Sequence, residues 1–156
     1  KIGLTVGTLF VKMSLPDTLT WLLTKDTSCF IKARNGRTKR SGAIQLTSEA
    51  GNLMNLNKAK FSGSNNKSIG LSLDGNVVKM GVKSTKKANK PAKATGAVVL
   101  KKNFRSSVAT IKKQVLDNHY RADLSQAALA RYSALYKLNR VAQGTVKAPE
   151  FKRGRK

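Results

Sequence analysis

The chain has 156 residues, of which 31 are Lys or Arg and only 7 are Asp or Glu, giving a net charge of +24. The length predicts one domain, and 40% apolar residues suffice for a modest core. Because such a charge opposes folding through self-repulsion, it indicates a polyanionic partner: nucleic acid, an anionic membrane, or an acidic protein or glycan. The single cysteine, Cys29, excludes an internal disulfide framework, fits a reducing compartment and is interpreted as a small buried side chain.

Residues 1–13 are expected to form an N-terminal extension outside the domain, because Met13-Ser14 resembles an ordinary translation start. A short helix is predicted over residues 16–25. Ser14 can cap it, Pro16 suits its first turn, and Asp17 favours the positive end of the helix dipole. The chain contains no run of 18 apolar residues, so no membrane span is predicted.

Two antiparallel hairpins are predicted next. Residues 27–32 and 42–46 are expected to pair around the Asn35-Gly36 turn. The sequence "SIGLSL" alternates apolar and small residues, the chain turns at residues 74–76, and apolar residues alternate again up to Val82. The tip of the first hairpin carries five basic residues: Lys32, Arg34, Arg37, Lys39 and Arg40.

The composition changes after Val82. The sequence "KSTKKANKPAKATG", residues 83–96, has five lysines and no acid, aromatic or large apolar side chain. Such a segment offers no apolar surface to offset the entropy of ordering it, and Pro91 argues against a stable helix. We therefore predict that it is extended, makes few contacts with the protein's own core and lies along a polyanion.

Two helices are predicted towards the C-terminus, with Asp123 as the cap of the second and Gly144 at its end. Arg131 projects into the apolar stripe of the second helix, where it either snorkels along the stripe or reaches a phosphate or base. The three tyrosines, at 120, 132 and 136, either stack on unpaired bases or pack against a neighbouring helix. The residues predicted to pack the helices together are Val108, Ile111, Leu124, Leu135 and Leu138.

The predicted architecture is α+β: a small antiparallel sheet with a short N-terminal helix, followed by a C-terminal helical pair and basic extensions. Its expected parts are the extension 1–13, an α/β domain 14–82, a lysine-rich connecting segment 83–102, a helical pair 103–143 and a basic tail 144–156.

No catalytic constellation is visible, and no cofactor, metal or small-molecule substrate is predicted. The seven acids form no obvious acid/base pair, and the glycines lack the spacing of a phosphate-binding loop. Cys29 and His119 alone are too few for a zinc site, and His119 has no evident partner to tune it.

Eleven Lys and Arg and no acid lie between Gly75 and Leu116. Cations at this density are typical of proteins that displace counterions from a phosphate backbone. Besides the five residues of the hairpin tip, the candidate RNA-binding residues are Lys83, Lys86, Lys87, Lys90, Lys93, Lys101, Lys102, Arg105, Lys112, Lys113, Arg121, Arg131, Lys152, Arg153 and Arg155.

A family resemblance covers the chain from about Leu19 to Val141. In the first half it rests on Leu19-Thr20-Trp21, Ser28, Phe30-Ile31-Lys32, Asn52-Leu53, Asn57, Phe61 and Gly63. In the helical half it rests on Lys102-Asn103, Ile111, Tyr120-Arg121-Ala122-Asp123-Leu124, Ala127-Ala128 and Arg131-Tyr132-Ser133-Ala134. The chain resembles the eukaryote-specific large-subunit (60S) ribosomal protein twenty-eight family. Ala122 departs from the family pattern, in which a proline is expected.

The resemblance implies a structural, non-enzymatic constituent of the cytosolic large ribosomal subunit. It implies contacts with ribosomal RNA, including expansion segments, and with neighbouring ribosomal proteins. It also implies a location in cytoplasmic ribosomes and, during assembly, in the nucleolus.

Three alternatives stay open: a basic chromatin or DNA-binding protein, a ribosome-assembly factor with a related domain, and a secreted cationic protein. A secreted protein of this size more often has paired cysteines. The related assembly factors carry an acidic C-terminal region, whereas this sequence ends in "FKRGRK".

Overall fold

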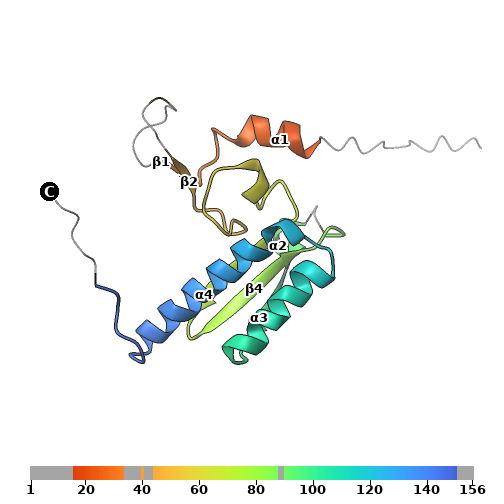
Figure 1. Ribbon diagram of the computed structural model, residues 1–156. Helices are drawn as coiled ribbons and strands as arrows, with labels where there is room; N and C mark the ends of the chain where they lie inside the picture. Colours follow the sequence, from red (N-terminus) through yellow and green to blue (C-terminus); the bar gives the residue numbers. More distant parts are fainter. Residues whose placement is uncertain (1–15, 34–39, 41–43, 88–89, 151–156) are drawn as a thin grey trace, which may run out of the picture.

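The predicted α+β class is confirmed by the computed structural model, which describes residues 16–33, 40, 44–87 and 90–150 (Figure 1). Its strands form a two-stranded sheet of β1 and β2 and a three-stranded sheet in the order β3-β4-β5. The strands are β1 (Ile31–Ala33), β2 (Gln45–Thr47), β3 (Ile69–Asp74), β4 (Val77–Lys83) and β5 (Thr95–Leu100). The helices are α1 (Asp17–Thr24), α2 (Pro91–Ala94), α3 (Phe104–Lys112) and α4 (Ser125–Ala142).

Short irregular helical segments join these elements. Two are single 3-10 turns, η2 (Ala59–Phe61) and η4 (Ala122–Leu124), and the third, η3 (Lys113–Asp117), is a π-helical turn that continues α3. The predicted N-terminal helix is confirmed as α1, with Pro16 in the cap position. The proposed cap Ser14 and the extension 1–13 lie outside the described residues.

The second predicted hairpin is confirmed, and the first is confirmed as an antiparallel pairing with shorter, shifted strands. In the first, β1 and β2 pair antiparallel with Lys32 opposite Leu46, although the strands have only three residues each. Its Asn35-Gly36 turn lies outside the described residues. In the second, β3 and β4 pair from Ile69–Val82 to Asp74–Val77, so Gly75 and Asn76 form a two-residue loop. Gly75 has a φ of 56°, the conformation that favours glycine at the first position of such a loop.

The lysine-rich segment was predicted to be extended, non-helical and in little contact with the core. This is wrong at its two ends, and a short helix, α2, begins at Pro91, where proline suits the first helical position. The described lysines between the ends, Lys86, Lys87, Lys90 and Lys93, are exposed as expected. Lys83 ends β4, Ala94 is buried, and Thr95 begins β5, which pairs with β4 along its whole length. Both ends of the segment are tied to the sheet because the apolar residues that follow it complete the sheet as β5. Residues 83–102 therefore include a strand and do not merely connect two parts.

One face of the three-stranded sheet packs against α3 and α4 (Figure 1). Alternate residues of β3 and β4 point to this face, as the period of a strand requires. At roughly 25 cal/mol per Å² of apolar surface, this burial is the main favourable contribution to folding. The buried residues of this core are Leu53, Ile69, Leu71, Val78, Met80, Leu100, Ile111, Val115, Leu124, Ala128 and Tyr132.

The residues predicted to pack the helices together are confirmed with one exception on α4: Ile111 and Leu124 are buried, and Val108 and Leu135 are partly buried against the core. Leu138, expected in the core, is 56% exposed, whereas Tyr132 is 1% exposed. The Tyr132 ring stacks on the Phe104 ring with centroids 5.4 Å apart, which places the tyrosine at the centre of the α3–α4 contact. One turn of α4 before Tyr132, Ala128 is buried, and two turns after it Asn139 donates a hydrogen bond to the Asn76 carbonyl at 2.8 Å. The core face of α4 therefore includes Leu124 and Leu135 as predicted, but it also includes Tyr132 and leaves Leu138 outside.

The ends of α3 and α4 have the local features that stabilise helix ends, but the predicted cap at the start of α4 is not one of them. The Asn103 side chain accepts a hydrogen bond from the Ser106 amide and caps α3. Gly144, with a φ of 70°, follows the end of α4 as predicted. The predicted cap Asp123 is wrong, because its carboxylate lies in η4 and pairs with Arg121 instead.

A loop of small and polar residues approaches the opposite face of the sheet. A Cβ atom at Gly70 would lie 2.9 Å from the Ala50 carbonyl oxygen. Within the loop, a Cβ atom at Gly63 would lie 2.6 Å from the Gly51 Cα. The loop therefore closes on itself through direct contact between two glycine backbones.

Candidate nucleic-acid interface

Lys83 is a structural cation. Its Nζ donates hydrogen bonds to the carbonyl oxygens of Gly63 at 3.1 Å, Ser64 at 2.6 Å and Asn66 at 3.4 Å. An ammonium group has three donors, and these three carbonyl oxygens accept hydrogen bonds from it within the protein. The side chain therefore fastens the 63–66 loop to the end of β4.

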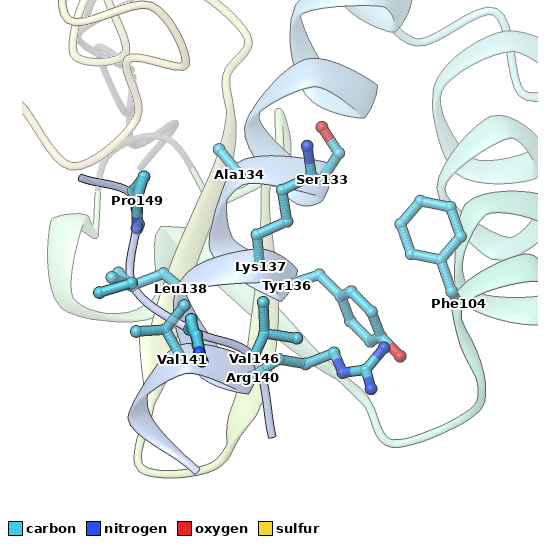
Figure 2. Close-up of a pocket in the computed structure, with 12 residues that line it drawn as sticks. Phe104, Ser133, Ala134, Tyr136, Lys137, Leu138, Arg140, Val141, Val146 and Pro149 are labelled. Atoms are coloured by element: carbon cyan, nitrogen blue, oxygen red, sulfur yellow. The ribbon is translucent and has the colours of Figure 1, made fainter. Parts of the chain in front are cut away.

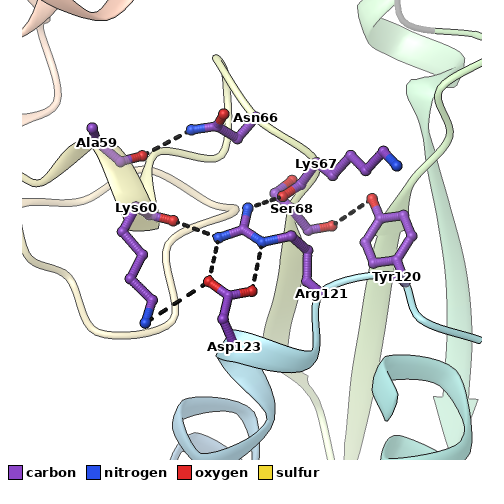
Figure 3. Close-up of polar contacts among 8 residues, drawn as sticks. All are labelled: Ala59, Lys60, Asn66, Lys67, Ser68, Tyr120, Arg121 and Asp123. Atoms are coloured by element: carbon purple, nitrogen blue, oxygen red, sulfur yellow. Dashed lines mark hydrogen bonds and ion pairs between the residues drawn. The ribbon is translucent and has the colours of Figure 1, made fainter. Parts of the chain in front are cut away.

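Arg121 is also engaged within the protein (Figure 3). Its Nη1 donates to the Lys67 carbonyl and its Nη2 to the Lys60 carbonyl, both at 2.8 Å. Its Nε and Nη2 also donate to the two carboxylate oxygens of Asp123, at 2.9 and 3.0 Å. The hydrogen bond from Arg121 is the main reason why the pKa of Asp123 is lower than its ordinary value.

Tyr120 joins the two halves of the domain. Its hydroxyl lies 2.5 Å from the Lys83 carbonyl oxygen and 3.4 Å from that of Ser68 (Figure 3). Burial raises the pKa of this phenol above its usual value, so it stays a hydrogen-bond donor. Tyr132 and Tyr136 both contact Phe104, with ring centroids 5.4 and 5.1 Å away. Of the two roles considered for the tyrosines, packing is thus the one that the structure supports.

Most of the exposed cations among the described residues gather at two ends of the domain. At the first end, the connection from β4 to β5 carries four exposed lysines, and α3 ends nearby. In Figure 1 this end is where α2 is labelled and where α4 begins. The exposed basic residues of this first basic end are Lys86, Lys87, Lys90, Lys93, Lys112 and Lys113.

The second basic end lies where β5 ends and α3 begins. Lys101, Lys102 and Arg105 are exposed there. The last turn of α4 and the chain that follows it add Arg140 and Lys147, both exposed.

Neither basic end is neutralised by the chain's own acids. Among the described residues, ion pairs join Lys60 to Asp123, Arg121 to Asp123 and Lys79 to Asp74. None of these involves a cation of either basic end. Such cations are available to an external anion.

The remaining candidate RNA-binding residues do not form a single cluster with either basic end. Lys32 and Arg40 are exposed, and Arg131 is half-buried on α4 beside the loop residues Asn52 and Asn55. Both readings of Arg131 therefore stay predictions. The other candidates lie outside the described residues: Arg34, Arg37, Lys39, Lys152, Arg153 and Arg155.

The described part of the chain offers little other chemistry. No three of its His, Cys, Asp or Glu side chains gather as metal ligands, and none of its helices is long and apolar enough to span a membrane. Cys29 is exposed, so its interpretation as a buried side chain is wrong. It lies in a turn before β1, outside the core.

Sequence reasoning missed an apolar groove of about 930 Å³ along α4 (Figure 2). The groove passes between α4 and the returning chain at 146–149, and Phe104 also lines it. Its exposed apolar side chains include Leu138, assigned to the core by its helical spacing, and Val146, which follows the helix. The only sequence signal for the groove was Leu138, an apolar residue on the side of α4 that does not face the core.

A small α+β domain with two unneutralised basic ends is typical of proteins that assemble with a polyanion. Residues 19–138 match the model of the Ribosomal L28e protein family, and the chain belongs to this family. It is therefore a large-subunit ribosomal protein, a ribonucleoprotein component of the cytoplasmic translation machinery. The family is of a structural, non-enzymatic kind, and its partners are ribosomal RNA and ribosomal proteins.

Proposed function

We propose that this chain binds large-subunit ribosomal RNA, including expansion segments, through the exposed lysines and arginines of its two basic ends. Its role is structural and involves no catalysis. The observation that carries the proposal is the first basic end, where six exposed lysines have no acidic partner among the described residues. An RNA backbone supplies the missing negative charge, and release of its counterions drives binding.

The fold holds both ends of the connection that carries four of these lysines. The connection between β4 and β5 is held at both ends, because β4 and β5 pair from Lys83–Thr95 onward and the Ser84 amide bonds the Ala94 carbonyl at 2.7 Å. The exposed lysines between these points are therefore presented on an anchored loop. This lowers the conformational entropy lost when they meet phosphates.

Two of the predicted RNA-binding residues have a different main role. Lys83 and Arg121 hold the 60–68 loop through backbone carbonyls. We propose that they support the interface indirectly, by fixing the elements that carry the exposed cations. The remaining predicted residues, including those of the 34–40 tip and the 152–155 tail, are proposed to contact RNA phosphates directly.

The same chemistry has consequences for assembly. We propose that the protein joins the subunit in the nucleolus, where ribosomal RNA is first present, and that neighbouring ribosomal proteins contact the surfaces left free by RNA. The bound RNA neutralises part of the +24 charge and so reduces the self-repulsion of the fold.

Lysine footprinting tests the proposal. An amine-reactive reagent is applied to the free protein and to assembled large subunits, and modification is read peptide by peptide. Lys86, Lys87, Lys90 and Lys93 are expected to react in the free protein and to be protected in the subunit. Ultraviolet crosslinking of the subunit should then place nucleotides on the same peptides. Equal reactivity in both states would contradict the proposal, and so would protection accompanied only by protein crosslinks.

A further inference from the structure

The groove along α4 is an exposed apolar surface on a strongly charged protein. Leu138 is 56% exposed, Val146 45% and Phe104 38%, and all three line it. It borders the core face of α4, because Phe104 stacks on the buried Tyr132 and Tyr136 is partly buried against the core, whereas Leu138 and Val146 extend its apolar wall outwards. Exposed apolar surface of this kind normally marks a binding site.

The charged residues of the groove are all cationic. Lys137, Arg140 and Lys147 line it, and no Asp or Glu does. Figure 2 shows the Arg140 side chain extending beside the Tyr136 ring, towards the side on which Phe104 lies. From Leu124 to Lys156 the sequence has one acid, Glu150, against eight Lys and Arg. The ligand must therefore combine apolar faces with negative charge.

We propose that this groove binds unpaired nucleotides of RNA, with bases against its apolar wall and phosphates at Lys137, Arg140 and Lys147. The inference rests on the proposed RNA-binding function and names what one part of the surface recognises. A nucleotide carries an apolar base face and a phosphate in every unit, so it matches both features of the groove. Unpaired bases stack on aromatic rings and guanidinium planes, whereas a paired base hides its faces within a helix.

Other occupants fit less well. A second copy of this chain would bring further positive charge to the three cations, since every copy carries +24. A peptide from another protein would need apolar and acidic side chains in the same short segment. Duplex RNA could meet the cations but would leave Leu138 and Val146 without a partner.

The test compares two RNA hairpins of equal length and charge, one fully paired and one with a bulge of unpaired purines, binding to the full chain. The wild-type protein is expected to prefer the bulged hairpin. Leu138→Ser should reduce this preference about five-fold, which corresponds to about 1 kcal/mol, the lower end of what one stacked base contributes. Val146→Ser, on the opposite wall, should act in the same direction.

Leu22→Ser is the matched control, because Leu22 is 58% exposed and does not line the groove. It should leave the preference unchanged. If Leu138→Ser and Val146→Ser keep the wild-type preference, or if the control loses it equally, the inference is wrong while RNA binding stands. If neither hairpin binds the wild-type protein, the proposed function itself fails.

A photo-crosslinking amino acid in place of Leu138 tests the site in assembled large subunits. Crosslinks to RNA nucleotides that are unpaired in the subunit support the inference. Crosslinks to a protein segment, or to nucleotides within a duplex, overturn it.

Discussion

Arg121 and Asp123 form a two-pronged ion pair at the start of α4, with Nε–Oδ1 and Nη2–Oδ2 distances of 2.9 and 3.0 Å. The same guanidinium group holds the carbonyls of Lys60 and Lys67. One side chain thus joins the helical half of the domain to the loop before β3. Its planar fork of donors is the feature that permits this.

Arg121→Lys is expected to destabilise the protein by about 1–3 kcal/mol, because an ammonium group cannot reach all four acceptors and leaves carbonyls unpaired. Thermal or urea unfolding measures the change. Lys58→Arg is the control, since Lys58 is exposed and outside this network. An unchanged unfolding midpoint for Arg121→Lys would show that the network contributes nothing.

The Asp123 pair predicts a pH dependence. The folded-state pKa of Asp123 is lowered, chiefly by the hydrogen bond from Arg121, so the pairing stabilises the fold above the ordinary Asp pKa. This contribution is lost as pH falls through the folded-state value. Asp123 is 41% exposed, so the effect should be at most about 1 kcal/mol. The stability difference between wild type and Asp123→Asn should be present at pH 7 and vanish in acid; a difference that persists there would contradict the assignment.

Gly63→Ala should destabilise the protein by about 1–3 kcal/mol, because the new methyl group would overlap the Gly51 backbone. Gly96→Ala is the matched control: its nearest neighbour would be the Val82 carbonyl oxygen, at the ordinary contact distance of 3.9 Å. Unfolding by urea compares the two variants. Equal midpoints would mean that the loop adjusts without cost.

The different burial of Ile111 on α3 and Leu138 on α4 makes a prediction about these two aliphatic residues. Ile111→Ala should cost about 2–5 kcal/mol, because Ile111 is 1% exposed within the core. Leu138→Ala should change stability by less than about 0.5 kcal/mol, because Leu138 lies in the exposed groove. Calorimetry of the two variants tests this. A large loss for Leu138→Ala would return Leu138 to the core, as the sequence predicted.

Local patterns were enough to predict the antiparallel hairpins and the helices α1, α3 and α4, but not the short helix α2, which begins at Pro91. The β3–β4 hairpin follows from alternating apolar residues around Gly75, and α3 follows from the spacing of Val108, Ile111 and Val115. Strand β5 was missed because its pairing with β4 is not visible in a stretch that begins with Thr95-Gly96. On α4, Leu138 was wrongly assigned to the core because Tyr132 was not counted as part of the apolar contact.

The charge of the sequence predicted the class of partner but not the role of each cation. Lys83 resembles its neighbours in the sequence, yet its acceptors are carbonyls some 20 residues earlier, at Gly63 and Ser64. Arg121 likewise finds Lys60 and Lys67 only after the domain has folded. Which cations stay exposed is therefore a property of tertiary structure.

The most direct test of the account is the salt dependence of RNA affinity for the wild type and two variants. One variant replaces Lys86, Lys87, Lys90 and Lys93 with Ala, and the other is Lys83→Met. If the exposed lysines meet phosphates, the slope of log affinity against log salt should shrink by about 0.7–0.9 for each lysine removed, with little change in melting temperature. Lys83→Met should lower the melting temperature and leave the slope nearly unchanged. A wild-type slope in the four-lysine variant, or a slope reduced as much by Lys83→Met alone, would contradict the account.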